Sequence, residues 1–411
     1  MKFLLSFLLC CYFFIPLTVL AAEETTEDEA MNFPDAAYAP PIEGEVEFPW
    51  DKYFGYKNGF FIRTPDDDFS LFFNASFQAR YLYSQVDNVN DYQRFDMRRI
   101  TLYFSGHFID ESWTYVLGTA TNPAGDIITD DAYIAKAFND YTWAQVGQFT
   151  TPFLRESLVS RTRQLTIERS LITKYFSTNT STGTLFGIEN EILKWTASMT
   201  NGYFQHDKSQ EDEEEIGNHD FQNGQTYAFI SRLEFKPFGN WQEFRDFNSP
   251  GDNQTGLLIG IAGGYQRDND TADIEEVSST VDVSFQGSGW SLFSMMAATK
   301  DRINDRATSY GAQLQGGLFV DEERDTIELF SRYEWGNSAQ LDPATNSDSE
   351  DLNVLTTGFN YYIYPAHLKL TADFGYAFGG LGENWADERN GWRANPDDGQ
   401  WVARSQIQLV I

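Results

Sequence analysis

Apolar and polar residues alternate along most of this chain. The stretch 68–84, DFSLFFNASFQARYLYS, shows the pattern clearly. Successive side chains of a β-strand point to opposite faces, so a strand here separates two sets of residues. The apolar set is Phe69, Leu71, Phe73, Ala75, Phe77, Ala79, Tyr81 and Tyr83, and the polar set is Ser70, Asn74, Ser76, Gln78 and Arg80. The pattern predicts a strand with one apolar face and one face in water.

Similar alternation recurs in about sixteen segments, which are joined by connections of two kinds. An even number of strands, with short turns at one end and long loops at the other, is typical of bacterial transmembrane β-barrels. The long connections lie at 85–93, 202–223, 267–276, 337–350 and 380–399, and 237–254 is long for the end with the short turns. The predicted strands lie near 68–84, 94–108, 112–121, 129–138, 141–150, 182–190, 192–201, 225–236, 255–266, 276–287, 289–300, 308–320, 326–336, 351–364, 367–379 and 400–411.

The fold predicted from this pattern is all-β, a closed antiparallel transmembrane β-barrel. A soluble β-sandwich or propeller also alternates, but sixteen long strands are unusual in a sandwich and no blade repeat is found. After the first residues, no stretch has a convincing helical period or the roughly 20 apolar residues of a membrane helix. Aromatic residues make up 16% of the chain, which fits the aromatic girdles of a barrel.

The N-terminus has the layout of a secretory signal peptide over residues 1–21, with Lys2, an apolar run and small residues before a cleavage site. Both cysteines, Cys10 and Cys11, lie in that run, so the mature chain contains none. Residues 22–55 are acidic and contain proline, which predicts a periplasmic tether, and the barrel domain follows over 56–411. Removing Lys2 leaves 28 basic and 61 acidic residues, a net charge of −33, which excludes nucleic acid as a partner.

Enzyme chemistry has little support in the sequence. The four histidines, His107, His206, His219 and His367, have no metal-ligand spacing. A nucleophile elbow, a phosphate-binding glycine loop and a dinucleotide fingerprint are all missing, and strand parity suggests no convincing Ser and His pair. We therefore predict a protein that is not an enzyme and that needs no cofactor or metal.

One stretch of this acidic chain is basic. Residues 150–176 carry five basic residues and only two acids, Glu156 and Glu168, a local charge of +3. The basic residues are Arg155, Arg161, Arg163, Arg169 and Lys174. The alternation of the predicted strands places seven further basic residues on the face in water: Arg80, Arg99, Lys194, Arg232, Arg332, Lys369 and Arg404. The same face carries five acids: Glu234, Asp282, Glu328, Glu334 and Asp373. The lumen is therefore expected to be only mildly positive.

The stretch 143–171, WAQVGQFTTPFLRESLVSRTRQLTIERSL, resembles the phosphate-selective porin O and P family. The resemblance lies in Val-Gly-Gln-Phe, then Pro-Phe, then a Glu and a later Glu-Arg-Ser, in that order. Four other segments look like corresponding family stretches, at 56–83, 94–108, 231–239 and 358–378. The resemblance covers residues 56 to 411.

The resemblance implies a homotrimeric, sixteen-stranded channel of the bacterial outer membrane, embedded in its lipid. The loop 150–181 would fold into the lumen and form a constriction. Family members line that constriction with Arg and Lys to favour small hydrophilic anions such as phosphate. Glu156 and Glu168 match family positions, which implies that they fasten the loop. This loop has only one lysine, Lys174, where the phosphate specialists have a denser lysine set.

Two questions stay open in the sequence. Arg155 with Glu156, and Glu168 with Arg169, could form mutual or barrel-wall ion pairs, whereas Arg161, Arg163 and Lys174 have no acid nearby in sequence and are expected to face solute. The function is expected to be an anion-leaning porin. The alternatives are a general or cation-leaning porin with an acidic mouth, and a plugged adhesion or structural barrel.

The last residue, Ile411, is not the aromatic residue with which barrels commonly end.

Loop length also predicts the orientation, because short turns of such barrels face the periplasm. Protease added to intact cells should therefore cut within the exposed acidic connection at 206–220. The measurement is the appearance of two fragments on a gel of washed cells. Cleavage that occurs only after the cells are ruptured would reverse the orientation.

Overall fold

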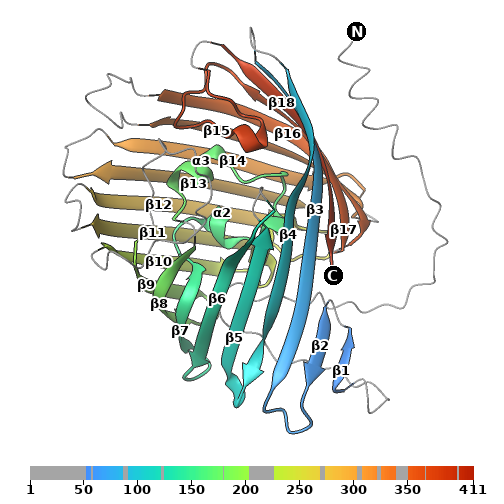
Figure 1. Ribbon diagram of the computed structural model, residues 1–411, viewed down its shortest axis with the longest axis vertical. Coiled ribbons are helices and arrows are strands. Elements are labelled where there is room, and N and C mark those ends of the chain that lie inside the picture. The colour runs from blue at the N-terminus through green and yellow to red at the C-terminus, as the bar shows by residue number, and fades with distance from the viewer. Residues whose placement is uncertain are drawn as a thin grey trace, which may run out of the picture. The chain divides into compact units, whose positions relative to one another are not determined.

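A closed ring of sixteen antiparallel strands forms the protein (Figure 1). The computed structural model describes residues 52–56, 59–86, 91–121, 125–178, 180–202, 226–268, 274–302, 308–321, 325–338, 350–365, 367–395 and 398–411. Each strand from β3 to β18 pairs with the next, and β18 pairs with β3, so these strands form a closed ring. Closure satisfies the backbone hydrogen bonds, which lipid cannot do. The sixteen-stranded barrel predicted from the sequence is confirmed.

The strands of the ring lie close to the predicted segments. Two short strands that were not predicted, β1 (Phe54–Tyr56) and β2 (Phe60–Arg63), precede the ring, and β2 pairs with β3. The stretch 206–220, residues 1–21 and most of 22–55 lie outside the described residues. The ring consists of β3 (Ser70–Val86), β4 (Tyr92–Phe108), β5 (Asp110–Thr121), β6 (Ile127–Ala137), β7 (Thr142–Thr150), β8 (Thr180–Glu189), β9 (Leu193–Thr200), β10 (Thr226–Phe238), β11 (Gly256–Asp268), β12 (Ile274–Gly287), β13 (Trp290–Asp301), β14 (Ser309–Phe319), β15 (Ile327–Ser338), β16 (Glu350–Tyr364), β17 (Leu368–Ala377) and β18 (Gln400–Val410).

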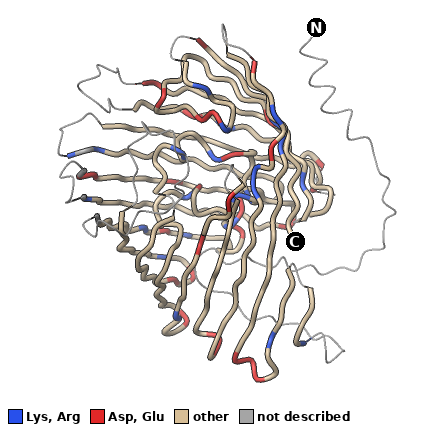
Figure 2. Tube along the Cα trace, in the orientation of Figure 1, with Lys and Arg blue, Asp and Glu red and all other residues tan. Residues whose placement is uncertain are grey.

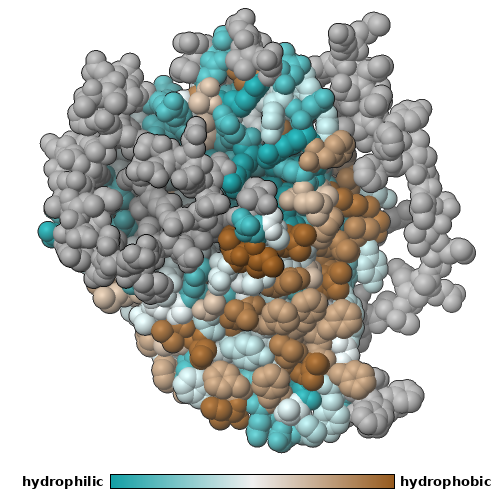
Figure 3. All heavy atoms as spheres, in the orientation of Figure 1, coloured by the Kyte–Doolittle hydropathy of each residue, from teal (hydrophilic) through white to brown (hydrophobic). Residues whose placement is uncertain are grey.

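The outer face of the ring is apolar. Burial alternates strictly along most of β15, where Leu329 points outward and is 48% exposed while Arg332 points inward and is 3% exposed. Figure 3 shows apolar side chains across the lower half of the visible wall, with hydrophilic residues above it and at its lower edge. This distribution is what a bilayer requires, because lipid chains offer no partner to a polar group.

The inner face is not polar everywhere. On β13 the inward side chains include Phe293, Met295 and Ala297, all buried. They belong to an apolar cluster that also contains residues of the β7–β8 connection. Polar residues are needed on the inner face only where water fills the lumen, and here other parts of the chain fill it. The alternation along a strand therefore predicts whether a side chain points inward or outward, but not whether it contacts water or other parts of the protein.

Two β-bulges change which residues face inward. On β4 the register shifts where Gln78 pairs with Arg99 and Ala79 pairs with Met97, so Arg98 is the extra residue. On β6 a similar shift leaves Asp130 and Asp131 as consecutive residues without regular partners. A bulge re-aims side chains, and both residues of each pair face the interior. Regular alternation would expose one charge of each pair to lipid, at a cost of about 2–4 kcal/mol near the midplane for arginine.

Three connections fold into the ring. The inward loop, residues 151–179, joins β7 to β8 and carries α2 (Arg155–Leu158), η1 (Arg161–Arg163) and α3 (Leu171–Phe176) (Figure 1). The floor segment, residues 239–255, joins β10 to β11 at the short-turn end and carries η3 (Glu243–Arg245). The cover segment, residues 378–395, follows β17 at the long-loop end and carries η4 (Glu388–Asn390). Among the described residues, every helix is too short or too polar to cross a membrane.

Apolar contacts join these connections into one core inside the ring. Trp385 of the cover segment is 1% exposed, and its ring lies 4.6 Å from that of Tyr175 in α3. Phe247 of the floor segment lies 4.7 Å from Phe293 of β13, ring to ring. Ser160 and Ser170 cap the short helices of the inward loop by accepting hydrogen bonds from Thr162 N and Thr173 N. The side of the lumen next to β13–β16 is therefore filled by packed protein.

The assignment of outer and inner faces can be tested with one arginine on each face. Leu314 lies at the centre of β14 and points outward, so Leu314→Arg should lower the free energy of unfolding by about 2–4 kcal/mol, the cost of an arginine in lipid near the midplane. Thr196→Arg on the inner face of β9 is the control and should cost less. Urea unfolding in lipid vesicles, followed by tryptophan fluorescence, measures both. Equal losses would contradict the assignment.

Candidate pore constriction

The inward loop leaves a cavity open along one side of the lumen. Its volume is about 630 Å³, and its lining comes from the wall β3–β11, the end of β18, the inward loop and the floor segment. Seven basic and six acidic side chains line it. Because the numbers nearly balance, the positions of these charges must decide which solutes are attracted.

Of the five basic residues predicted for the constriction, Arg155, Arg161 and Arg169 line this cavity. Arg163 instead pairs with Asp246 of the floor segment, with Nε 3.5 Å from Oδ1. Lys174 pairs with Asp387 of the cover segment at 3.4 Å and donates a hydrogen bond to the carbonyl of Ala386 at 2.9 Å. The sequence placed no acid near Arg163 or Lys174, but the fold brings acids to both from distant segments.

Glu168 joins the inward loop to β3 and β4. Its carboxylate accepts hydrogen bonds from Arg80 Nη1 at 2.9 Å and from Arg99 Nη2 at 2.7 Å, and it also pairs with Arg98. Figure 2 shows basic and acidic positions close together in this central part of the ring. Burial raises the pKa of the Glu168 carboxyl, but the three arginines outweigh burial and hold that pKa well below its usual range. The carboxylate therefore stays charged.

Glu156 holds the inward loop at a second point. It is fully buried and accepts hydrogen bonds from Ser170 N at 3.2 Å, from Ser170 Oγ and Thr173 Oγ1 at 2.5 Å each, and from Gln313 Nε2 of β14 at 3.0 Å. Arg332 of β15 lies 3.5 Å away. The sequence left open whether Glu156 and Glu168 pair within the loop or with the barrel wall. Both acids pair with the barrel wall.

The seven bases predicted to line the lumen all face the interior, but most are covered. Six are less than 10% exposed: Arg80, Arg99, Arg232, Arg332, Lys369 and Arg404. Several of them bind the inward loop, since Arg232 donates to Phe153 O at 3.0 Å, Arg332 to Glu168 O at 2.9 Å and Lys369 to Gln164 O at 3.1 Å. Lys194 differs in being partly exposed; like Arg99 and Arg232 it lines the cavity, and it pairs with Glu189 at 3.1 Å.

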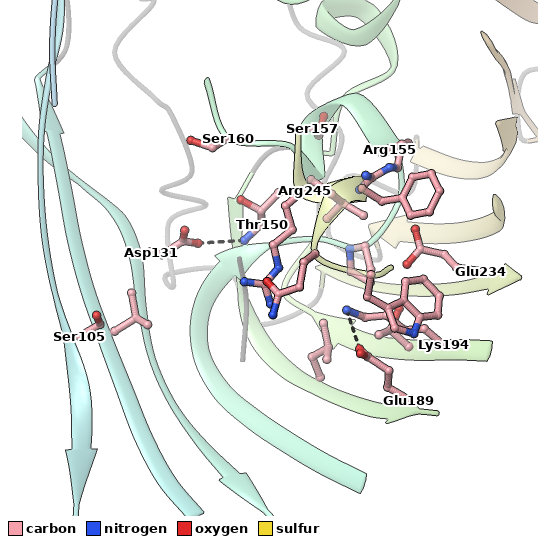
Figure 4. A pocket seen from close by; sticks show the side chains of 18 of the residues that line it. Ser105, Asp131, Thr150, Arg155, Ser157, Ser160, Glu189, Lys194, Glu234 and Arg245 are labelled. Carbon is pink, nitrogen blue, oxygen red and sulfur yellow. Dashed lines mark hydrogen bonds and ion pairs between the residues drawn. The ribbon is translucent and has the colours of Figure 1, made fainter. Parts of the chain in front are cut away.

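Two consecutive acids line the cavity from a bulge that the sequence did not suggest. Asp130 and Asp131 of the β6 bulge line it; Tyr103 donates a hydrogen bond to Asp130, and Thr150 N donates to Asp131 Oδ1 at 3.1 Å. In Figure 4, Asp131 lies on one side of the pocket, while Arg155 and Lys194 lie on the other and Arg245 lies between them. A signal for this site would have been the two consecutive acids in a segment that otherwise alternates.

A Ser and His pair on adjacent strands does exist. Ser70 Oγ lies 2.7 Å from His107 Nδ1, and the backbone N–H of His107 donates to the same Oγ at 3.0 Å. Ser70 is fully buried, so no substrate reaches its hydroxyl. The pair fastens β3 to β4. Within the described residues, no three or more His, Cys, Asp or Glu side chains are arranged to hold a metal ion.

A closed barrel with an apolar exterior, an inward loop and a charged cavity defines a channel protein of the bacterial outer membrane. The model of the family described as phosphate-selective porin O and P matches residues 73–377. The chain belongs to this porin family, as its motifs predicted.

One relative resembles this chain in sequence, and solved structures resemble it in fold at low sequence identity. An uncharacterized protein of Aquifex aeolicus is 24% identical over 275 residues, which are 62% of this chain and 64% of that protein, so the match spans less than two thirds of the relative. The anion-selective porin from Comamonas acidovorans has a TM-score of 0.53 at 9% identity, covering 84% of this chain and all of that one. The outer membrane protein OmpT of Vibrio cholerae, in its trimer form, has a TM-score of 0.51 at 10% identity, covering 83% and 100%.

The anchoring role of Glu168 can be tested by Glu168→Gln. The substitution leaves three arginines without their shared anion, and breaking a buried pair in this way typically costs about 3–5 kcal/mol. We expect the inward loop to loosen, which single-channel recordings in planar bilayers would register as increased current noise. Glu189→Gln, which breaks an exposed pair worth about 0–1 kcal/mol, is the control. A Glu168→Gln channel as quiet as the wild type would exclude the anchoring role.

The same recordings can test how the current noise depends on pH. The folded pKa of Glu168 is depressed, so its stabilisation is fully present above the unfolded pKa of about 4.3 and is lost as pH falls through the folded pKa. Wild-type current noise should therefore stay constant from neutral pH to about 4.3 and rise only under more acidic conditions. The Glu168→Gln channel should lack this acid transition.

Proposed function

We propose that this porin passes small hydrophilic anions in preference to cations, and that the arginines of the inward loop provide the preference. Arg155, Arg161 and Arg169 line the cavity from the loop. Arg161 carries the proposal, because in the part of the chain that the structure describes no acid lies within ion-pair distance of its guanidinium. A partly exposed cation of this kind is available to a passing solute.

Charges act over short distances in salt solution, so charges at the constriction should influence ion selectivity more than charges on the outer loops. Two unit charges 4 Å apart interact by about 1 kcal/mol in water and about 4 kcal/mol near a protein surface. Salt screens exposed charges beyond a Debye length of about 8 Å. Acids that lie farther than this from the constriction therefore contribute little there, although acidic residues dominate the mature charge of −33.

A general or cation-leaning porin is the second candidate. Asp130 and Asp131 favour it, because they place two carboxylates on the cavity wall. Hydrogen bonds from Tyr103 and Thr150 N hold them in place. A plugged adhesion barrel has less support, since the cavity runs beside the inward loop rather than being filled by it.

Further properties remain proposals that rest on the family and on the sequence. They are a homotrimeric assembly, removal of residues 1–21 by a signal peptidase, and short turns that face the periplasm. A trimer form exists for the Vibrio cholerae protein of similar fold, which supports the first. Phosphate is a candidate solute because of the family, and the single lysine of the inward loop favours a broader range of small anions.

Reversal potentials under a salt gradient test the proposal. Arg161→Gln should shift the reversal potential toward cations, because it removes an accessible positive charge from the cavity. Lys174→Gln is the matched control and should shift it little, since Lys174 is paired with Asp387. A variant in which Arg161, Arg163 and Lys174 are all replaced by Gln should behave like Arg161→Gln alone.

Three results would contradict anion preference. One is a wild type that is already strongly cation-selective, and another is an Arg161→Gln channel with the wild-type reversal potential. The third is an Asp130→Asn variant whose shift toward anions exceeds the shift that Arg161→Gln causes toward cations. That outcome would favour the cation-leaning porin.

A further inference from the structure

The outer face of the ring carries pairs of aromatic side chains at the long-loop end. Tyr227 of β10 and Tyr265 of β11 point outward, with their ring centres 6.3 Å apart. Tyr310 of β14 and Trp335 of β15 form a second outward pair at the same distance of 6.3 Å. Aromatic residues of transmembrane barrels gather where the bilayer meets water. These four residues therefore mark the level of the lipid headgroups on this side of the ring.

A groove separates the two aromatic pairs on β12 and β13. Val277 of β12 lies opposite Tyr265 in the strand register, and Lys300 of β13 lies opposite Val277. Ala298 of β13 lies opposite Tyr310. Val277, Ala298 and Lys300 line a groove with a volume of about 560 Å³. The groove is therefore on the outside of the ring, at the level of the headgroups.

The end of the groove nearest the long connections is basic. Lys300 and Arg302 both line it and point outward. The Arg302 side chain is 58% exposed, and its Nη1 lies 3.4 Å from Oε1 of Glu275 on β12. Arg267 of β11, also exposed, lies opposite Glu275 in the register. Among the outward side chains that the structure describes at this end of β11–β13, three are thus basic and one is acidic, although the whole chain is strongly acidic.

The outer wall next to the groove is apolar toward the middle of the membrane. Met296 of β13 is 53% exposed and lies opposite Val281 of β12, which is 43% exposed. A molecule that matches both parts has an anionic head and long apolar chains. Phosphate oxygens accept charge-assisted hydrogen bonds from lysine and arginine together, and acyl chains pack on apolar side chains. A free phosphate ion would match the basic end alone.

We propose that this groove binds a phosphorylated lipid of the leaflet at the long-loop end. Its phosphate accepts hydrogen bonds from Lys300 and Arg302, and its acyl chains lie along Ala298 and Met296. In the bacterial outer membrane, we assign this lipid to the glycolipids of the lipid A type, which carry phosphate groups on their sugars. The proposal goes beyond anion passage, because the groove lies outside the channel. It relies on the proposed orientation, in which the long connections face the cell exterior.

Native mass spectrometry of the purified protein in detergent, titrated with lipid A, tests the site. Each basic residue near an anionic headgroup contributes about a factor of five to binding, so the double variant Lys300→Gln, Arg302→Gln should raise the Kd for lipid A about 25-fold. Glu275→Gln should lower the Kd, because Glu275 competes with the phosphate for Arg302. An opposite sign of the two effects separates phosphate recognition from a general effect of altering the surface.

Lys136→Gln is the matched control. Lys136 also points outward, but it lies at the short-turn end of β6 and pairs with Asp110 at 3.9 Å. This variant should bind lipid A with the wild-type Kd. An equal loss in Lys136→Gln would indicate general charge attraction and overturn the site. Wild-type binding by the double variant would overturn it as well.

Three competing occupants give different results in the same spectra. Displacement of lipid A by inorganic phosphate would indicate a site for small anions, and equally tight binding of phosphatidylglycerol would contradict a preference for the glycolipid. A double variant that keeps lipid A but separates into single chains would assign this face to contacts between copies of the protein. Each of these results would overturn the lipid site and leave the proposed anion preference intact, because reversal potentials report on the lumen.

Discussion

One buried carboxylate, Glu168, is the constraint on which the arrangement of the lumen depends. Three arginines from two adjacent strands meet at it, and two of them, Arg98 and Arg99, are consecutive residues. The β4 bulge is needed for this geometry, because a regular strand would turn one of the pair to lipid. Neither the arginines nor the carboxylate would be tolerated alone in the interior, so the bulge, the inward loop and β3 depend on one another.

The anchored loop divides the interior into two unlike halves. Toward β13–β16 it packs through apolar side chains, and Phe293, Met295 and Ala297 of the barrel wall complete that core. Toward β3–β10 it leaves polar and charged groups around a cavity. The charged groups around the cavity therefore come from one part of the barrel wall and from the connections that fold into the ring.

Strict alternation was enough to predict the ring, its strand number and nearly all strand positions, because lipid on one side imposes a period of two. It did not predict Arg98, Asp130 or Asp131, because a bulge breaks that period and turns two consecutive residues to the same face. The basic residues of the inward loop were recognised as a group. The acids that pair with Arg163 and Lys174, Asp246 and Asp387, could not be found from sequence distance, since tertiary contacts join them. The long connection at 237–254 was noticed, but its path inside the ring required the three-dimensional contacts.

The inward loop is fastened on both sides of the junction where the first and last strands of the ring meet. Glu168 pairs with Arg80 on β3, while Gln408 on β18 donates to Thr162 O at 2.9 Å and Asp373 on β17 accepts from Ile167 N at 3.3 Å. Residues 151–179 leave the ribosome long before β17 and β18, yet they acquire these partners only when the sheet has closed. The narrow part of the passage thus has its full set of contacts only in the closed barrel. An incomplete barrel would lack part of them, so the shape of the passage depends on closure of the sheet.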